Sequence, residues 1–255
     1  MHFKDKVILV TGASRGIGAA IAQAFAREGG LVVVNYLRQQ AAAEAVVASC
    51  QALGGDAFAV AADVTQPEAV QAMVAQVLRE AGKIDVVVNN AFAPYRFDPE
   101  QRKMFWDTTW ADYHTQVDGA VRATYNLCQA VLPHLRQRGQ GSLINLVSDL
   151  TERPSIPYHD YATAKSALVG FSRTLAAELG PLGIRVNCVA PGLVYPTDAS
   201  RHTPEAVKDA IRAQTPLRRI ATPEDVTGPV LFLASDWSRF MTGQMLMVDG
   251  GLVMG

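Results

Sequence analysis

Residues 7–18 read Val7-Ile8-Leu9-Val10-Thr11-Gly12-Ala13-Ser14-Arg15-Gly16-Ile17-Gly18. The first four residues form a short apolar run, typical of a strand that is buried on both faces. The glycine-rich turn after this run leads into an alanine-rich helical pattern that continues through Arg27. Glycines allow a tight turn and a close approach of the backbone to a pyrophosphate, whose charge is favoured at a helix N-terminus. The pattern therefore predicts a nucleotide-binding strand, turn and helix, with Gly12, Ser14, Arg15, Gly16, Ile17 and Gly18 at the phosphates.

The same alternation of strand and helix continues to the end of the chain. Further apolar runs predict strands over residues 31–36, 57–62, 84–88, 142–147, 184–189 and 245–248. Helical patterns separate these runs, and no linker or change of composition divides the chain. Alternating strands and helices favour a parallel sheet with helices on both faces. We predict an α/β fold, with residues 1–255 forming a single doubly wound Rossmann-type domain around a seven-stranded parallel sheet.

Composition excludes several classes of protein. The 255 residues are 49% apolar with a formal net charge of −1, as in an ordinary soluble protein, and no basic patch indicates a nucleic acid partner. The three cysteines have neither disulfide nor CxxC spacing, no apolar run is long enough to span a membrane, and no signal peptide precedes the first strand. The histidines lack metal-ligand spacing. We expect a cytoplasmic protein with no metal and no membrane partner.

The end of the second predicted strand bears on the choice of cofactor. A carboxylate there would bind the adenosine ribose hydroxyls, whereas a cation would accommodate a 2′-phosphate. The sequence has Asn35, Tyr36 and Arg38 at this place and no acid, and Arg15 lies in the glycine turn. These residues predict a preference for NADP(H) over NAD(H).

Two further strands end in polar residues at the same edge of the sheet. Asp63 and Val64 follow the third predicted strand, and Asn90 and Ala91 follow the fourth. Ligands of doubly wound sheets bind at the carboxyl ends of the strands. We expect Asp63 to accept a hydrogen bond from the adenine amino group, with the other three residues beside the bound nucleotide.

Tyr161 and Lys165 stand four positions apart at the start of a strong helical pattern. Side chains at this spacing lie on one face of a helix. A lysine ammonium close to a phenol favours tyrosinate, so we expect Lys165 to lower the pKa of Tyr161. The pair is a candidate for general acid/base chemistry.

Together these residues resemble the short-chain dehydrogenase/reductase family, of the compact type with a TGxxxGxG turn. The resemblance covers nearly the whole chain and is closest in look to 3-oxoacyl-acyl-carrier-protein reductases. Its motifs are the glycine turn, Asp63-Val64, Asn89-Asn90-Ala91, Ser148 placed 13 positions before Tyr161, Tyr161-x-x-x-Lys165, Pro191-Gly192 and Val248-Asp249-Gly250-Gly251.

The resemblance implies a role for each catalytic residue. Tyr161 would be the general acid/base, Ser148 would polarise the substrate carbonyl, and Lys165 would bind the nicotinamide ribose. Pro191, Gly192 and the backbone of Val194 would lie at the nicotinamide, with Val194 holding its carboxamide. The protein would interconvert a carbonyl and a secondary alcohol of a small molecule. Members of this type commonly form tetramers, and the small residues Ala164, Ala167 and Gly170 would let helices of two subunits approach closely.

Three positions depart from the family pattern. Ala120 stands where the family has the asparagine of a proton relay, and Gln116 or Asp118 are candidate substitutes. Phe92 replaces the glycine after Asn-Asn-Ala and should narrow the site near the nicotinamide. The segment 195–215, expected to be a lid, has Pro196 where a threonine is usual.

Two other functions remain open from the sequence. Tyr158 stands seven positions before Lys165, which is the spacing of the related enoyl-acyl-carrier-protein reductases. The intact glycine turn and Ser148 favour carbonyl chemistry over that alternative. A nucleotide-binding regulatory protein without turnover is the other reading, because the relay asparagine is missing.

Overall fold

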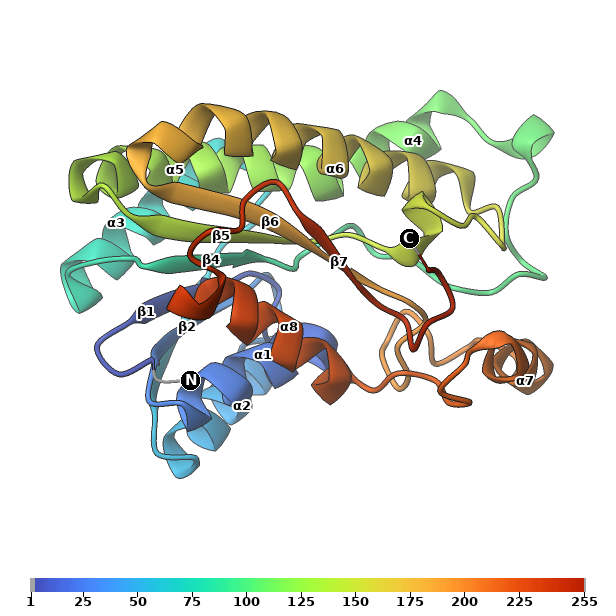
Figure 1. The fold of residues 1–255 in the computed structure, drawn as a ribbon, viewed down its shortest axis with the longest axis horizontal. Coiled ribbons are helices and arrows are strands. Elements are labelled where there is room, and N and C mark those ends of the chain that lie inside the picture. Colours follow the sequence, from blue (N-terminus) through green and yellow to red (C-terminus); the bar gives the residue numbers. More distant parts are fainter. Residues whose placement is uncertain (1–2, 255) are drawn as a thin grey trace.

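The computed structural model describes residues 3–254, and its centre is one parallel sheet of seven strands (Figure 1). The strand order is β3-β2-β1-β4-β5-β6-β7, and every neighbouring pair is parallel. This confirms the predicted fold class. The strands are β1 (Val7–Val10), β2 (Leu31–Tyr36), β3 (Asp56–Ala61), β4 (Val86–Asn89), β5 (Gly141–Leu146), β6 (Ile184–Pro191) and β7 (Met245–Val248).

Helices cover both faces of the sheet. In Figure 1, α3, α5 and α6 lie above the sheet, whereas α1, α2 and α8 lie below it. The helices are α1 (Gly16–Arg27), α2 (Gln40–Ala52), α3 (Pro67–Ala81), α4 (Trp110–Val117), α5 (Ala123–Arg138), α6 (His159–Leu179), α7 (Glu205–Gln214) and α8 (Pro223–Ala234). The order of strands reverses between β1 and β4, so a crevice for a ligand is expected at their carboxyl ends.

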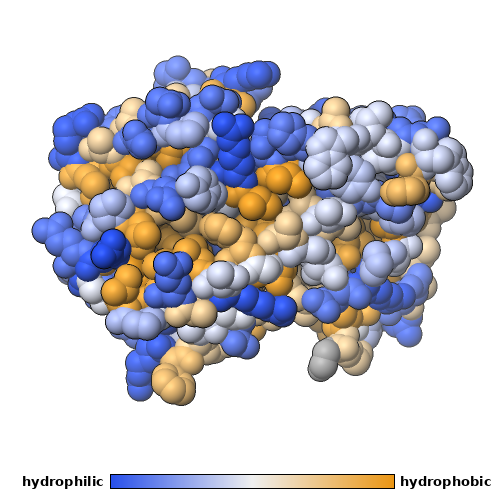
Figure 2. Space-filling view, turned by 90° about the horizontal axis from the view of Figure 1, so that it is seen from above, coloured by the Kyte–Doolittle hydropathy of each residue, from blue (hydrophilic) through white to orange (hydrophobic). Residues whose placement is uncertain are grey.

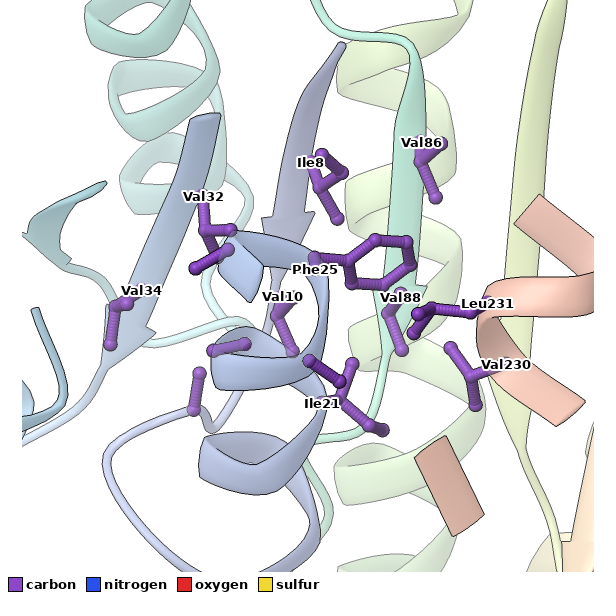
Figure 3. Packing of buried hydrophobic residues seen from close by; sticks show 14 of the residues in the cluster. Ile8, Val10, Ile21, Phe25, Val32, Val34, Val86, Val88, Val230 and Leu231 are labelled. Atoms are coloured by element: carbon purple, nitrogen blue, oxygen red, sulfur yellow. The ribbon is translucent and has the colours of Figure 1, made fainter. Parts of the chain in front are cut away.

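The core has two layers because alternate side chains of a strand point to opposite faces. Ile8 and Val10 of β1 pack toward α1 and α8 with Phe25, as Figure 3 shows. Val7 and Leu9 pack into the other layer, which contains residues of α3 and α5. All four β1 residues are buried, which explains why the strand is a continuous apolar run.

The helical stretch between β4 and β5 is interrupted. α4 ends at Val117, a π-helical turn spans Asp118–Arg122, and α5 then begins at Ala123. A π turn inserts an extra residue and so rotates the helix before it relative to the helix after it. Gly119 lies in this turn, and a Cβ on it would be 2.4 Å from the backbone nitrogen of Ala93. The close approach of these two backbones accompanies the irregular turn.

The segment between β4 and α4 is mostly irregular. It contains one short 3-10 turn, Phe105–Asp107. The predicted lid segment, 195–215, contains α7 and the turn that precedes it. Both segments lie at the carboxyl end of the sheet (Figure 1).

Among the helices of residues 3–254, none is both long enough and apolar enough to cross a membrane.

Two glycine substitutions should have opposite effects on stability. A Cβ on Gly18 would lie 2.5 Å from the carbonyl oxygen of Gly12 and 2.6 Å from Nδ2 of Asn90, whereas a Cβ on Gly228 meets nothing within 4 Å. We expect Gly18→Ala to destabilise the protein, because the turn must move. Gly228→Ala, in an exposed part of α8, should stabilise it by about 1 kcal/mol. Urea unfolding measures both, and equal effects of the two variants would contradict the close approach.

Candidate active site

The glycine turn is held in place by side chains from two neighbouring strands. Asn35 accepts a hydrogen bond from the backbone nitrogen of Gly12 at 3.2 Å. The amide of Asn90 donates to the carbonyl oxygens of Thr11 and Gly12 at 2.9 and 3.1 Å. Gly12 has φ +61°, and a Cβ there would be 3.0 Å from the Cα of Ala91. The turn and the end of β4 therefore fit together only if position 12 is glycine.

The N-terminus of α1 is suited to bind an anion. No side chain of the described residues caps this end, and its first turn contains no acidic residue. By contrast, α4 and α8 each begin with a capping box. The first backbone N–H groups of a helix need partners, and the helix dipole favours negative charge beside them. A pyrophosphate at Gly16 and Ile17 would supply hydrogen-bond acceptors for these N–H groups and negative charge for the dipole. The residues present therefore fit a dinucleotide.

Asn35 does not act as we predicted. Its side chain is 2% exposed, and its amide donates to the carbonyl oxygens of Val60 and Ala62 while its oxygen accepts from Gly12. These hydrogen bonds lie within the protein, so the side chain positions the turn and is not exposed to a ligand. Sequence reasoning missed this because the partners come from β3 and the glycine turn.

Both arginines predicted at the 2′-phosphate have accessible side chains. Arg38 is exposed beyond the end of β2, next to the half-buried Tyr36. Arg15 is 59% exposed and forms an ion pair with Asp198 at 2.9 Å. A solvent-exposed ion pair of this kind contributes little to stability. Arg15 can therefore exchange Asp198 for a phosphate at small cost.

Asp63 and Val64 lie at the end of β3 with part of their polar groups engaged. One carboxylate oxygen of Asp63 accepts hydrogen bonds from the backbone and hydroxyl of Thr65, at 2.9 and 2.7 Å. The carbonyl oxygen of Val64 accepts from Asn126 at 3.1 Å. The second oxygen of Asp63 has no hydrogen bond among the described residues. That oxygen is the group suited to an adenine amine.

Ser148, Tyr161 and Lys165 meet where β5 ends and α6 begins. Their exposed fractions are 5%, 7% and 4%, so the three polar groups lie in a nearly dry site. The hydroxyl of Ser148 interacts with the phenol of Tyr161 and lowers its pKa. The ammonium of Lys165 donates to the carbonyl oxygen of Leu146 at 2.7 Å. The structure thus brings together these three residues, of which the first and the last are 17 positions apart in the sequence.

Burial governs the protonation of these groups. It raises the pKa of Tyr161, the hydroxyl of Ser148 opposes this effect, and the charge of Asp149 raises the pKa further. Burial lowers the pKa of Lys165 to about 8. Burial is the largest of these influences on Tyr161, and our expectation that Lys165 lowers this pKa stays a prediction. The protein therefore holds Tyr161 as a neutral phenol that can donate a proton.

The structure limits the candidates for the proton relay. Ala120 is buried in the π-helical turn and offers no polar side chain. Asp118 points outward, where it pairs with Arg122 at 3.3 Å and His114 at 3.8 Å. Gln116 is the polar residue of this region that is buried, at 5% exposed. Of the two substitutes proposed from the sequence, Asp118 is excluded by its direction.

An aromatic cluster surrounds Tyr161. It consists of Phe92, Tyr95, Phe97, Tyr158 and Tyr161. The ring of Tyr161 lies 5.0 Å from that of Tyr95 and 5.1 Å from that of Phe97. Phe92 lies against Tyr161 at 6.1 Å and against the ammonium of Lys165 at 5.3 Å. Phe92 thus narrows the site beside Lys165, where the family pattern has a glycine.

Tyr158 takes a different position from Tyr161. It is 4% exposed, and its ring packs against Tyr95 at 5.7 Å and Phe97 at 5.5 Å. Burial raises its pKa, and the carboxylate of Asp98 acts in the same direction. The described contacts of Tyr158 are therefore with the segment after β4, whereas Tyr161 interacts with Ser148.

Two segments that are distant in the sequence close over this cluster. The backbone nitrogen of Phe97 donates to the carbonyl oxygen of Ala199 at 2.9 Å, and the hydroxyl of Thr203 donates to the carbonyl oxygen of Phe97 at 2.8 Å. Tyr95 is fixed through its hydroxyl, which donates to Asp160 at 2.9 Å. The irregular segment after β4 and the segment before α7 therefore form one continuous wall.

Pro191, Gly192 and Val194 lie at and just beyond the end of β6. Gly192 donates its backbone N–H to the carbonyl oxygen of Val248 at 3.1 Å. Val194 is 5% exposed and bridges Ala221. These contacts hold the chain against β7 and the residues before α8, beside the end of β5.

Sequence reasoning missed Asp149. It directly follows Ser148 and is 6% exposed, with Oδ1 placed 3.2 Å from the Ser148 hydroxyl oxygen. Burial, followed by the charge of Asp249, raises the pKa of Asp149 to about 6. An acidic residue immediately after a catalytic serine was the available signal. Within residues 3–254, no three potential ligand side chains are grouped to hold a metal ion.

Comparisons with known proteins agree with this geometry. A family model described as Enoyl-(Acyl carrier protein) reductase matches residues 12–253. A 3-oxoacyl-acyl-carrier-protein reductase of Staphylococcus epidermidis is 36% identical, over 98% of this chain and 100% of the relative. An uncharacterised oxidoreductase of Methylorubrum extorquens is 40% identical over 98% of each chain. A solved 7α-hydroxysteroid dehydrogenase, in complex with NADH and 7-oxo glycochenodeoxycholic acid, superimposes with a TM-score of 0.86 and 32% identity over 98% of this chain and 95% of that one.

The buried carboxyl of Asp149 should make stability depend on pH. Its pKa is about 6 in the folded protein and near 3.8 when unfolded, so the ionised form is the less stable one when buried. The resulting penalty is complete above pH 6 and disappears as the pH falls toward 4. A shift of two units corresponds to about 3 kcal/mol. We expect Asp149→Asn to gain stability relative to the original chain at pH 8 but not at pH 4, as measured by urea unfolding. A difference that does not change with pH would contradict the raised pKa.

Proposed function

The chain belongs to the short-chain dehydrogenase/reductase family, and we propose that it is an NADP(H)-dependent enzyme that reduces a 3-oxoacyl thioester or a related carbonyl compound. The observation that supports this most directly is the buried group of Ser148, Tyr161 and Lys165 at the carboxyl end of β5. An uncapped helix N-terminus lies in the same crevice region of the sheet. The 3-oxoacyl reductase among its relatives matches over the whole chain.

Each catalytic side chain has a role that follows from its surroundings. A bound nicotinamide nucleotide supplies or accepts the hydride. Tyr161, a neutral phenol in this dry site, donates its proton to the oxygen of the substrate carbonyl, and takes it back in the reverse reaction. Ser148 holds that oxygen within reach of Tyr161. Lys165, fixed by the carbonyl oxygen of Leu146, is placed to bind ribose hydroxyls and to stabilise the tyrosinate that forms.

The geometry favours Tyr161 over Tyr158 as the acid. The phenol of Tyr161 interacts with the hydroxyl of Ser148, whereas the ring of Tyr158 packs against Tyr95 and Phe97. The matching family model has the name of an enoyl reductase, and that reaction is the alternative activity. Ser148 argues against it, because the related enoyl reductases have no serine at this place. A regulatory nucleotide-binding protein would have no need of the buried Tyr161 and Lys165.

Two further expectations, a homotetramer and a cytoplasmic location, belong to this proposal. Thr163, Ala167, Gly170, Thr174 and Ala177 form an exposed face of small residues along α6, while Ala164, which we had placed in this face, is buried within its own subunit. Figure 2 looks onto this side of the molecule, where apolar residues extend across the surface above α5 and α6. We place the contacts of a homotetramer there.

The three cysteines are buried and free, in keeping with a reducing compartment such as the cytoplasm.

Replacement of each tyrosine distinguishes the two activities. We expect Tyr161→Phe to reduce turnover of a 3-oxoacyl thioester by about 10²- to 10⁴-fold, because the proton donor is lost. Tyr158→Phe, its matched control, should remain within a few-fold of the original chain. NADPH oxidation is measured with a 3-oxoacyl thioester and, in parallel, with a 2-enoyl thioester.

Three outcomes of that assay would contradict the proposal. Loss of turnover in Tyr158→Phe with Tyr161→Phe unaffected would favour the enoyl reaction. Turnover of the enoyl substrate alone would do the same. Tight binding of NADPH with no turnover of any carbonyl compound would support a regulatory role.

The choice of cofactor is tested at Arg15 and Arg38. Both side chains are accessible, and each can form a charge-assisted hydrogen bond with a 2′-phosphate. We expect Arg38→Asp and Arg15→Ala each to lower kcat/KM for NADPH by about 10-fold or more, with little change for NADH. Equal losses with both cofactors would show that the arginines do not read the phosphate. The exposed Arg79 of α3, replaced by alanine, serves as the control.

A further inference from the structure

Asp149 lies directly behind the hydroxyl that is expected to touch the substrate. Its Oδ1 is 3.2 Å from the Ser148 hydroxyl oxygen, and its side chain is buried. The backbone nitrogen of Leu150 donates to the same hydroxyl oxygen at 3.3 Å. The proton of the Ser148 hydroxyl is therefore directed at the carboxyl group, and one acceptor position of the hydroxyl is used by a backbone N–H.

Few charged or titratable groups surround Asp149. Asp249, at the end of β7, is 8% exposed, and both acids line the backbone of Gly192. Arg153, four positions further along the chain, donates to Leu252 at 2.9 Å and Gln214 at 2.6 Å, and its charge acts to lower the pKa of Asp149. Tyr161 on α6 is the remaining titratable neighbour. Asp249 uses its own oxygens to accept from the backbone of Gly251 and Val253, so it does not compete for Ser148.

The protonation state of Asp149 can determine where the Ser148 hydroxyl proton points, because a hydroxyl has only one proton. Ser148 has one proton and two acceptor positions, and Leu150 occupies one of the latter. An ionised Asp149 can only accept, so it takes the Ser148 proton and leaves the second acceptor position facing the substrate. A protonated Asp149 can donate to that acceptor position instead, which releases the Ser148 proton toward the substrate.

We propose that Asp149 is a positioning residue that decides whether the Ser148 hydroxyl donates its hydrogen bond to the reacting oxygen of the substrate. Reduction and oxidation pass through the same transition state, in which that oxygen carries partial negative charge and needs a donor beside Tyr161. Protonated Asp149 thus favours both directions of the reaction, and ionised Asp149 slows both. The inference rests on the proposed function, in which Ser148 contacts the substrate oxygen.

No covalent bond is made to Asp149, and the proton balance of the reaction is unchanged. Tyr161 still gives one proton to the substrate oxygen during reduction and recovers one during oxidation. Asp149 only changes which way the Ser148 proton points. Its pKa of about 6 places the change within the range in which enzymes are assayed, because burial and the charge of Asp249 outweigh the stabilising hydrogen bonds.

The pH dependence of both reaction directions tests the proposal. Reduction of a 3-oxoacyl thioester and oxidation of the corresponding 3-hydroxyacyl thioester are measured from pH 5 to 8 as kcat/KM. For the original chain we expect kcat/KM in both directions, each divided by the value for Asp149→Asn at the same pH, to fall by about 10-fold or more as the pH rises through 6, since a single lost donor to a reacting oxygen has effects of at least this size. Asp149→Asn should itself show no such loss near pH 6, because its side chain stays neutral. Asp56→Asn, at an exposed position that begins β3, should retain the loss.

A second variant tests the same group without removing it. Asp249→Asn eliminates the neighbouring charge that raises the pKa of Asp149. The change in both profiles should therefore move to lower pH and remain visible. If Asp149 had only a structural role, the variant would change the size of kcat/KM but not the pH at which kcat/KM changes.

The outcomes separate this inference from the function on which it rests. If the original chain and Asp149→Asn show the same change near pH 6, the role of Asp149 is overturned and the oxidoreductase function stands. If Asp249→Asn leaves the position of the change unaltered, the proposed environment of Asp149 is wrong. If the original chain turns over no substrate at any pH while binding NADPH, the proposed function itself fails.

Discussion

The close contact between the glycine turn and the end of β4 is the constraint on which the rest of the site depends. Gly12 and Gly18 leave room for Ala91 and for the Asn90 amide, which binds two carbonyl oxygens of the turn. β1 and β4 are neighbours at the point where the order of strands reverses. One contact therefore aligns the phosphate end of the crevice with the segment, beginning at Phe92, that covers the catalytic residues. A side chain in this contact would disturb both halves of the site.

Desolvation sets the chemistry of the catalytic residues. It favours the neutral form of each buried group, so it raises the pKa of Tyr161 and Asp149 and lowers that of Lys165. The pKa of Asp149 thereby rises to about 6 and that of Lys165 falls to about 8, so both lie near neutral pH. Groups with such values exchange protons readily at ordinary pH. The energetic cost of burying them is met by the large apolar core of the same sheet.

The segment before α7 contacts both the glycine turn and the aromatic cluster. The segment before α7 touches the glycine turn through the ion pair of Asp198 with Arg15. It also touches the aromatic cluster through the hydrogen bonds of Phe97. A phosphate that displaces Asp198 would thus act on the same segment that holds the wall beside Tyr161. The exposed ion pair is weak enough to exchange, whereas the buried backbone bonds keep the wall in place.

The sequence by itself determined the class of the fold and pointed to the candidate catalytic residues. Apolar runs, the glycine turn and the Tyr161–Lys165 spacing are local patterns, and local geometry alone gives them meaning. Only the tertiary structure decided what the neighbours of each group are. Asn35 looked available to a ligand until residues of β3 and the turn engaged its amide, and Asp118 looked like a relay until the π-helical turn directed it outward. Asp149 gained its raised pKa from burial and from Asp249, 100 positions away, because β5 and β7 end beside the same glycine. Burial and long-range contacts are properties of the packed chain, so no local pattern can report them.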